Sequence, residues 1–263
     1  MQIGICASMD HAALAAQIGF DFLEENVQSF LTPLESDAIF SPHLEKARRC
    51  LLPITAANCF LPGVLKVTGP QVDPAALQRY AAVAFRRAAE AGIKSVVFGS
   101  GAARQIPAGF SVYQAVTQFL ELLKRLAPMA AAQRISILVE PLNRGECNFI
   151  NTLAQGADLV RKTGYPSVQL LADLFHMLRN GETAADAATY GSFVQHVHVA
   201  EKRQRTCPGV DNDDFIPFFR ALVSSGYRGG VSLECSFPNG LQADGPNALA
   251  TLRRQITAAG GST

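Results

Sequence analysis

The amino-acid sequence predicts a (β/α)8 barrel, and two observations support this fold class. Short runs rich in β-branched residues alternate with longer segments of helical pattern along the chain. Strict alternation favours a parallel sheet, because parallel strands need long crossover connections. Eight such units in about 250 residues give a repeat of about 31 residues, which is the scale of this barrel.

Eight short apolar runs are the expected strands. They are Gln2–Ser8, Phe20–Asn26, Ile54–Leu61, Ser95–Gly101, Ser136–Leu142, Val168–Leu174, Val194–Glu201 and Gly230–Phe237. A doubly wound open sheet is the alternative fold, but no Gly-rich phosphate-binding turn follows the first run. We expect one α/β domain over residues 1–263, because no low-complexity linker interrupts the pattern.

Four of the intervening segments carry clear helix signals. They are Asp73–Ala91, Ser111–Ala130, Asn151–Thr163 and Asp213–Ser225. The first segment has Asp73 as its expected N-cap, Pro74 at the first helical position and Gly92 past its end. The loops Pro62–Val72 and Lys202–Asp213 are long. We expect them at the active site, because the loops that follow barrel strands build it.

Composition and charge narrow the possible classes of protein. The 263 residues are 48% hydrophobic and 17% charged, which indicates a large core. A net charge of +1 argues against a surface for nucleic acid or for an anionic membrane. The six cysteines form no CxxC pair, and the sequence shows neither a signal peptide nor an apolar run of about 20 residues. We therefore expect a cytoplasmic protein with free thiols and a small-molecule partner. The sequence leaves the oligomeric state open, a homo-oligomer included.

Four polar residues near the ends of four successive expected strands are the candidate metal ligands. Glu140 lies in SILVEPL, Asp173 in VQLLADL, His198 in VQHVHVA and Glu234 in GVSLECSF. Their separations of 33, 25 and 36 residues are each close to one βα unit, so all four should meet at one mouth of the barrel. A buried carboxylate is costly unless it is paired or bound to metal. Three carboxylates and an imidazole suit one divalent ion, Mn²⁺, Mg²⁺ or Co²⁺, with Zn²⁺ as a further option. The alternative is four independent residues that cap loops or pair with arginines.

The histidines of this half of the chain divide by position. His196 and His198 share a strand face, because they are two residues apart. His198 lies nearer the mouth and is the better ligand, whereas His196 is expected to be structural or to support the ligands. His176 follows Asp173 by three residues and could reach the substrate. A helix-capping or solvent-exposed His176 is the alternative.

Several phrases of the sequence resemble a known family. VEPLNRGE, LLADLFHM, HVHVAE followed by RTCPG, and GYRGGVSLE are similar to the sugar isomerase/epimerase family with the xylose-isomerase-like TIM barrel. Within that family the pattern is most similar to the D-tagatose and D-psicose 3-epimerase branch. The resemblance is strongest from Ser136 to Glu234, and the NCFLPG and VTGP phrases within Asn58–Pro70 resemble the wider family.

The resemblance implies a role for each matching residue. Metal-binding positions of the family are matched by Glu140, Asp173, His198 and Glu234. Glu146 and His176 match substrate-binding residues, and Arg205 matches an arginine that contacts sugar hydroxyls. The loop EKRQRTCPGVDNDD has one residue more before its proline than the family pattern, and it lacks the second Gly after PG. Arg203 is therefore an alternative to Arg205.

The residues allow proton transfer at a carbon next to a carbonyl. Such a C–H group is too weak an acid for a carboxylate alone at neutral pH, and a divalent ion, Mn²⁺ before the others, would stabilise the enediolate. Glu140 and Glu234 lie on strands separated by two others, so they could act as acid and base on opposite faces of the carbon. The expected reaction is 3-epimerisation of a free ketose.

Other readings stay open. The same site could serve aldose–ketose isomerisation, hydroxypyruvate isomerisation or dehydration of an inosose, because a fold does not determine the chemistry. An apurinic endonuclease of the same barrel superfamily needs more histidines, and His11 and His43 fall in expected helical regions. A non-catalytic binding barrel is the remaining alternative.

Overall fold

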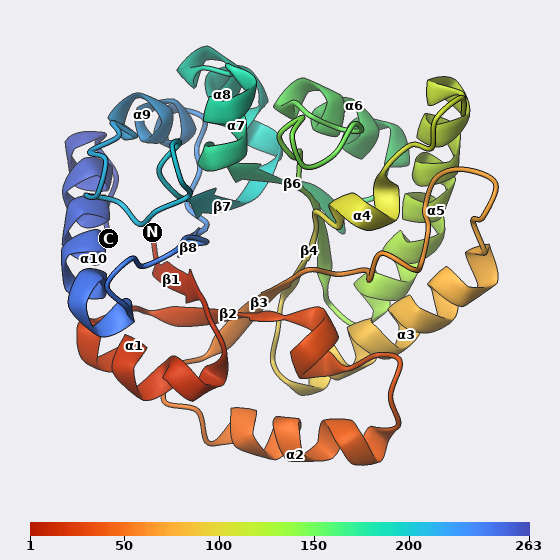
Figure 1. Ribbon diagram of the computed structural model, residues 1–263, viewed down its shortest axis with the longest axis horizontal. Helices are drawn as coiled ribbons and strands as arrows, with labels where there is room; N and C mark the ends of the chain where they lie inside the picture. Colours follow the sequence, from red (N-terminus) through yellow and green to blue (C-terminus); the bar gives the residue numbers. More distant parts are fainter.

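The structure, a computed structural model that describes residues 1–263, is a closed barrel of eight strands (Figure 1). The strands follow one another around the barrel in chain order, and β8 pairs in parallel with β1 to close the ring. They are β1 (Ile3–Cys6), β2 (Phe22–Asn26), β3 (Ile54–Asn58), β4 (Ser95–Phe98), β5 (Ser136–Val139), β6 (Val168–Asp173), β7 (Val194–Val199) and β8 (Gly230–Leu233). The predicted fold class is confirmed.

Helices surround this barrel on the outside (Figure 1). They are α1 (Ala12–Ile18), α2 (Asp37–Arg48), α3 (Pro74–Glu90), α4 (Gly101–Arg104), α5 (Val112–Ala132), α6 (Leu153–Thr163), α7 (Leu174–Asn180), α8 (Ala184–Tyr190), α9 (Ile216–Ser224) and α10 (Leu241–Ala258). Three short turns of helix, η1 (Met9–His11), η2 (Val27–Leu31) and η3 (Gly191–Phe193), complete the set. The predicted cap of α3 is present, because Asp73 accepts hydrogen bonds from the backbone N–H groups of Ala75 and Ala76, each at 3.0 Å.

The strands are shorter at their C-terminal ends than the sequence predicts. β3 ends at Asn58 and β4 at Phe98, because Cys59 and Ser100 follow them with φ angles of 54° and 40°. Positive φ values turn the chain out of the sheet and into the loops above it. The predicted helix from Asp213 is also too long at its start, since α9 begins at Ile216.

The core forms where the strands face the helices. A cluster of 67 buried residues fills this layer. A separate cluster inside the barrel consists of Val97, Leu138 and Leu171, on the neighbouring strands β4, β5 and β6. None of the helices combines the length and the apolar character that crossing a bilayer requires.

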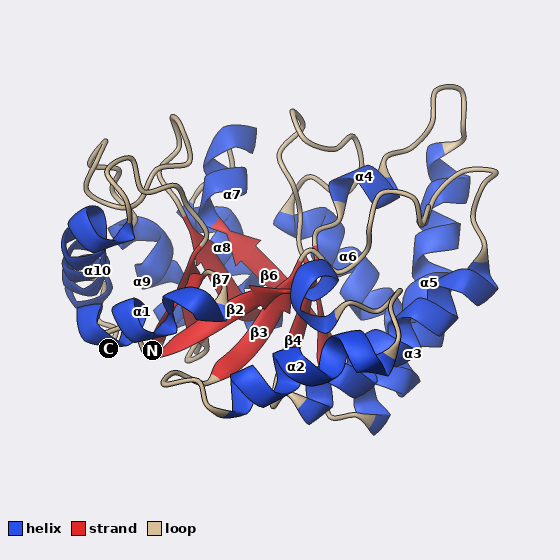
Figure 2. Ribbon diagram, turned by 60° about the horizontal axis from the view of Figure 1, so that its bottom comes forward, coloured by secondary structure: helices blue, strands red, loops and turns tan.

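The longer loops gather at one end of the barrel, where the strand arrows of Figure 2 point. The predicted loop regions after β3 and β7 belong to this end, since they follow the C-terminal ends of their strands. In (β/α)8 barrels this is the face that carries active sites. The residues that the sequence selects lie here.

Candidate active site

The four predicted metal ligands converge at the C-terminal ends of β5 to β8. Glu140 directly follows β5, Asp173 ends β6, His198 lies in β7, and Glu234 directly follows β8. One ligand atom of each residue lies within 4.8 Å of one from every other. The sheet register contributes directly, since Asp173 and His198 are paired across β6 and β7. The spacing of one βα unit thus brings these side chains to one point.

This cluster has the properties of a cation site. Glu140 Oε1 and His198 Nδ1 are buried without any hydrogen-bond partner and lie 3.4 Å apart, and His198 Nδ1 is 3.3 Å from Glu234 Oε2. Burial raises the pKa of Glu140, and burial together with the charge of Glu234 raises the pKa of Asp173 to about 6. Like charges that are buried together are costly, and a divalent cation would supply the missing partner. Three carboxylates and an imidazole fit Mn²⁺, Mg²⁺ or Co²⁺, with Zn²⁺ also compatible.

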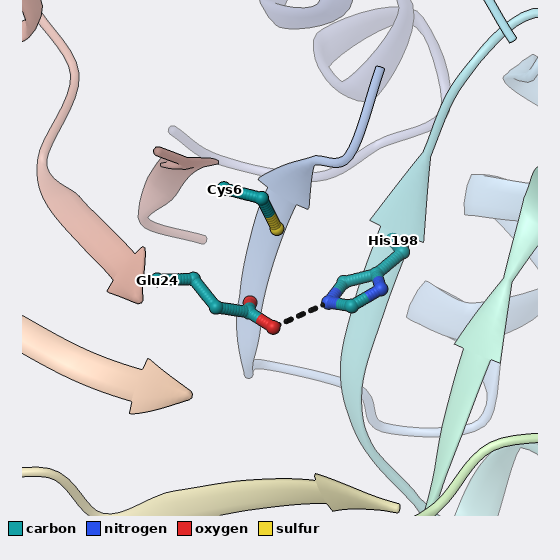
Figure 3. Close-up of side chains that lie close together, drawn as sticks. All are labelled: Cys6, Glu24 and His198. Atoms are coloured by element: carbon teal, nitrogen blue, oxygen red, sulfur yellow. Dashed lines mark hydrogen bonds and ion pairs between the residues drawn. The ribbon is translucent and has the colours of Figure 1, made fainter. Parts of the chain in front are cut away.

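A fourth acidic residue, Glu24 of β2, holds the histidines in place. Its Oε1 accepts a hydrogen bond from His198 Nε2 at 2.9 Å, and its Oε2 lies 2.9 Å from His196 Nε2 and 2.7 Å from Ser232 Oγ. Figure 3 shows Glu24 and His198 pointing toward each other, with Cys6 of β1 beside them. Burial alone would raise the pKa of Glu24, but His198 and His196 outweigh it and hold that pKa well below its usual range. His196 therefore supports the site from below and lies outside the four-ligand cluster.

Sequence reasoning missed Glu24 and also Asn58. Glu24 is 1% exposed and directly follows the buried residues Phe22 and Leu23 of β2, and a charge that continues a buried apolar pair is the signal that could have revealed it. Asn58, the last residue of β3, donates from Nδ2 to Glu234 Oε1 at 3.1 Å. Its position at a strand end is the corresponding signal for a residue at the barrel mouth.

Arg205, and not Arg203, is the arginine that enters the site. Its guanidinium donates to Glu234 and lies 3.4 Å from Asp173 Oδ2 and 3.5 Å from Glu146 Oε1. Arg203 is paired instead with Asp211, and its side chain is 70% exposed. Arg205 has a φ of 54°, a conformation that costs free energy in a non-glycine residue, and its side chain lines the cavity.

The loop that carries Arg205 is folded around a buried carboxylate. Glu201 is 1% exposed and accepts hydrogen bonds from the backbone N–H groups of Gly209 at 2.8 Å and Asn212 at 2.9 Å. It also accepts from the Asp211 N–H group and from the Thr206 hydroxyl. Glu201 therefore determines the shape of this loop, a role that no motif in the sequence indicates.

His176 and Glu146, the other two predicted substrate contacts, lie beside the cluster. His176 is in the first turn of α7, is 2% exposed, and has its Nε2 3.4 Å from Asp173 Oδ2. The solvent-exposed alternative for His176 is therefore wrong. Asp173 itself caps α7 by accepting a hydrogen bond from the Phe175 N–H group at 2.8 Å. Glu146 Oε1 lies 3.9 Å from His176 Nδ1.

A cavity of about 300 Å³ opens above these residues. Its polar lining includes Glu140, Glu146, His176, Arg205 and Glu234. Gly99 also lines it, and a Cβ atom there would lie 2.1 Å from a carboxylate oxygen of Glu140, so only glycine leaves that ligand its place. A hollow of about 430 Å³ on the outer surface, bordered by α1 and α2, contains none of these residues.

Comparison with protein families places this arrangement among known barrels. The model of the xylose isomerase-like TIM barrel family matches residues 12–254. The chain belongs to this family. The resemblance that the sequence suggested is confirmed, and relatives of this chain are named as 3-epimerases and as hydroxypyruvate isomerases.

Curated relatives match this xylose isomerase-like chain over part of its length. The putative hydroxypyruvate isomerase of Mus musculus is 33% identical over 123 residues, which are 45% of this chain and 44% of the relative. The D-psicose 3-epimerase of Ruminiclostridium cellulolyticum is 31% identical over 116 residues, 44% of this chain and 39% of the relative. The L-ribulose 3-epimerase of a Methylomonas strain is 34% identical over 113 residues, 43% of this chain and 39% of the relative. Each match therefore spans less than half of the relative.

Solved structures of other proteins share this fold over nearly the whole chain. The D-psicose 3-epimerase of Clostridium cellulolyticum H10, solved with D-tagatose, has a TM-score of 0.84 at 21% identity, over 97% of this chain and 99% of that chain. The D-allulose 3-epimerase of Methylomonas sp., in complex with D-allulose, has a TM-score of 0.74 at 25% identity, over 100% of this chain and 94% of that chain. The barrel and its outer helices are thus common to these enzymes and to this chain.

Proposed function

We propose that this chain is a divalent-metal-dependent ketose 3-epimerase. The observation that carries the proposal is the convergence of Glu140, Asp173, His198 and Glu234 within 4.8 Å. Two members of this set, Glu140 and Glu234, come from strands that are separated by β6 and β7. They can therefore approach one substrate carbon from different sides.

The proposed reaction moves protons between these carboxylates and the substrate. A divalent ion, for which we propose Mn²⁺ first, would stabilise the negative charge that develops on a ketose when it loses the proton at C3. One glutamate removes this proton as the C3–H bond breaks, and the electron pair enters the enediolate of the sugar. The other glutamate, in its protonated form, delivers a proton to the opposite face of C3 and forms the new C–H bond. Configuration at C3 is thereby inverted.

The surrounding residues are suited to hold hydroxyl groups. Arg205 and His176 can donate hydrogen bonds, Glu146 can accept them, and all three line the same cavity. Its volume of about 300 Å³ suits a single free monosaccharide. The relatives and structural neighbours named for psicose, ribulose and allulose support a sugar of this kind.

Hydroxypyruvate isomerisation is the second candidate, because the mouse relative carries that name. Hydroxypyruvate is an anion and would need a free cation in the cavity. Arg205, the only lysine or arginine that lines the cavity, already lies within 3.5 Å of carboxylate oxygens of Glu146, Asp173 and Glu234. Even with a divalent ion bound, the four carboxylates of Glu140, Glu146, Asp173 and Glu234 outnumber the three positive charges of the ion and Arg205, which favours an uncharged ketose over an anionic substrate.

The remaining alternatives find less support. Aldose–ketose isomerisation and inosose dehydration use the same proton abstraction and differ only in where the next proton goes. An apurinic endonuclease needs further histidine ligands, yet His11 and His43 are outside the metal-binding cluster.

A cytoplasmic location is part of the proposal and rests on six free thiols, which a reducing compartment preserves.

Proton exchange in D₂O tests the function directly. The Mn²⁺-loaded protein is incubated with fructose, psicose, tagatose, sorbose and hydroxypyruvate, the metal is removed, and the products are examined by NMR. Deuterium at C3 with inversion is the expected result. Deuterium at C1 or C2 with aldose formation would identify an isomerase instead, turnover of hydroxypyruvate alone would favour the second candidate, and no exchange in any ketose would contradict the proposal.

A further inference from the structure

Asn143, a buried residue of the loop after β5, lies between two of the proposed substrate contacts. Its Nδ2 atom is 2.8 Å from Glu146 Oε1 and 2.8 Å from His176 Nδ1. Its Oδ1 atom accepts a hydrogen bond from the Gly145 N–H group at 3.0 Å. Asn143 is 4% exposed, so both the Nδ2 and the Oδ1 atom of its amide are engaged by protein partners, with little access to water.

The orientation of this amide follows from two of its partners. The carboxylate of Glu146 is an acceptor, and the N–H group of Gly145 is a donor. Rotating the amide by half a turn would place Oδ1 against the carboxylate of Glu146 and the NH₂ group against the Gly145 N–H group. Both contacts would then be repulsive. The NH₂ group of Asn143 therefore faces His176, with one hydrogen for the histidine and one for the glutamate.

This orientation determines the protonation pattern of His176. Its Nδ1 atom faces an N–H donor, so Nδ1 must carry the lone pair, and the single ring proton is on Nε2. A proton on Nδ1 would oppose the Asn143 donor at 2.8 Å. The Nε2–H group is the side of the ring that lies 3.4 Å from Asp173 Oδ2, and His176 lines the cavity.

We propose that Asn143 is a positioning residue that locks His176 in its Nε2–H tautomer, so that the ring donates a hydrogen bond to a substrate oxygen. The same amide holds Glu146 as an acceptor on the neighbouring side of the cavity. A donor and an acceptor held side by side recognise a polyol, whose hydroxyl groups both accept and donate. This inference rests on the proposed function, because it requires a substrate oxygen above His176.

The tautomer is measurable without substrate. In ¹⁵N-histidine-labelled protein, recorded with Mg²⁺ or without metal, the signals of His176 are identified by their loss in His176→Gln. The expected pattern is a protonated Nε2 and an unprotonated Nδ1. In Asn143→Asp a carboxylate oxygen replaces the donor, so the proton is expected on Nδ1. Asn143→Ala removes the donor without adding charge, and a mixture of both tautomers is expected there.

Asn151→Ala is the matched control. Asn151 donates from its own buried amide to the carbonyl groups of Leu142 and Cys147 at 2.7 and 2.8 Å, in the same loop, without a contact to His176. This variant should keep the Nε2–H pattern. A wild-type ring with its proton on Nδ1, or an unchanged pattern in both Asn143 variants, would overturn the proposal.

Kinetics separate this inference from the proposed function. With a ketose that the wild type epimerises, Asn143→Ala should raise KM by about tenfold, because roughly one hydrogen bond to the substrate is lost. A changed tautomer with an unchanged KM would overturn the donor role of His176. A wild type that turns over no ketose would contradict the proposed function. The tautomer measurement would still test whether Asn143 determines the tautomer of His176.

Discussion

Glu24 and His198 are joined by a hydrogen bond of 2.9 Å between Oε1 and Nε2 inside the barrel. Because Nε2 is engaged, Nδ1 is the nitrogen that faces Glu140 and Glu234. A carboxylate on the far nitrogen of a ligand histidine orients the ring and increases its basicity. The metal cluster therefore depends on a residue that lies outside it.

Replacement of Glu24 by glutamine should weaken metal binding. We expect the Kd for Mn²⁺ to rise by about 10–100-fold, because the amide no longer supports the imidazole as a carboxylate does. Competition with a chelating dye measures this. Glu25→Gln is the control, since Glu25 is also buried on β2 but accepts from the backbone N–H groups of Met9 and Asn26. Equal Kd values for both variants would contradict the role of Glu24.

The two proposed acid/base residues should be essential for turnover. Glu140→Gln and Glu234→Gln keep the side-chain shape but remove the group that exchanges a proton. We expect each to lower kcat by about 10²–10⁴-fold or more while the circular dichroism spectrum is retained. Metal content must be determined on the same samples, because both residues are also proposed ligands. A metal-loaded variant with near wild-type kcat would remove that residue from the mechanism.

The neighbouring arginines should behave very differently. Arg205→Ala is expected to raise KM by roughly 10–100-fold, because charge-assisted hydrogen bonds to the substrate are lost. Arg203→Ala should leave KM and kcat close to wild type, since its side chain is 70% exposed and pairs with Asp211. His176→Ala and Glu146→Ala should resemble Arg205→Ala and retain metal. Unchanged steady-state constants in all three would show that these residues do not bind the substrate.

Glu182 should make the protein less stable as the pH rises. Burial raises the pKa of Glu182 from 4.5 to about 7, and its Oε2 atom is buried without a partner. Between these pH values the folded chain holds a proton that the unfolded chain has released, so the free energy of unfolding falls as pH increases through this range. The loss should be on the order of 1 kcal/mol, because part of the side chain remains in water.

Urea unfolding of wild type and Glu182→Gln at pH 5 and pH 8 measures this effect. The glutamine variant cannot ionise, so its stability relative to wild type should be greater at pH 8 than at pH 5. Glu45→Gln, an exposed glutamate of α2 far from Glu182 in the chain, is a control for a general change of surface charge. A difference between Glu182→Gln and wild type that is independent of pH would rule out the titration of Glu182 as the cause.

Metal removal should inactivate the protein without unfolding it. The core cluster of 67 buried residues forms independently of the site, so the chelated protein should keep its circular dichroism spectrum. Added Mn²⁺ should raise Tm and restore activity, because an ion that binds only the folded chain stabilises it. Loss of the spectrum on chelation would mean instead that the ion is required for folding.

The barrel and its four candidate ligands could be predicted because both depend on local sequence patterns. Apolar runs mark the strands, and helical segments between them require parallel pairing. Polar residues near the ends of β5 to β8, from Glu140 to Glu234, must then meet at one face, since parallel strands deliver their C-terminal ends together. The strand ends themselves were predicted too long, because the backbone turns at Cys59 and Ser100 leave no clear signal in the sequence.

By itself, the sequence determined the order of the βα units and the residues that reach the mouth of the barrel. The tertiary structure decided which contacts these residues make. Glu24 binds His198 from 174 residues away. Arg205 rather than Arg203 enters the site, because backbone N–H groups of the loop donate hydrogen bonds to the carboxylate of Glu201. Periodicity shows which residues share a face, but hydrogen bonds depend on the direction of side chains from distant segments, and only closure of the barrel brings those segments together.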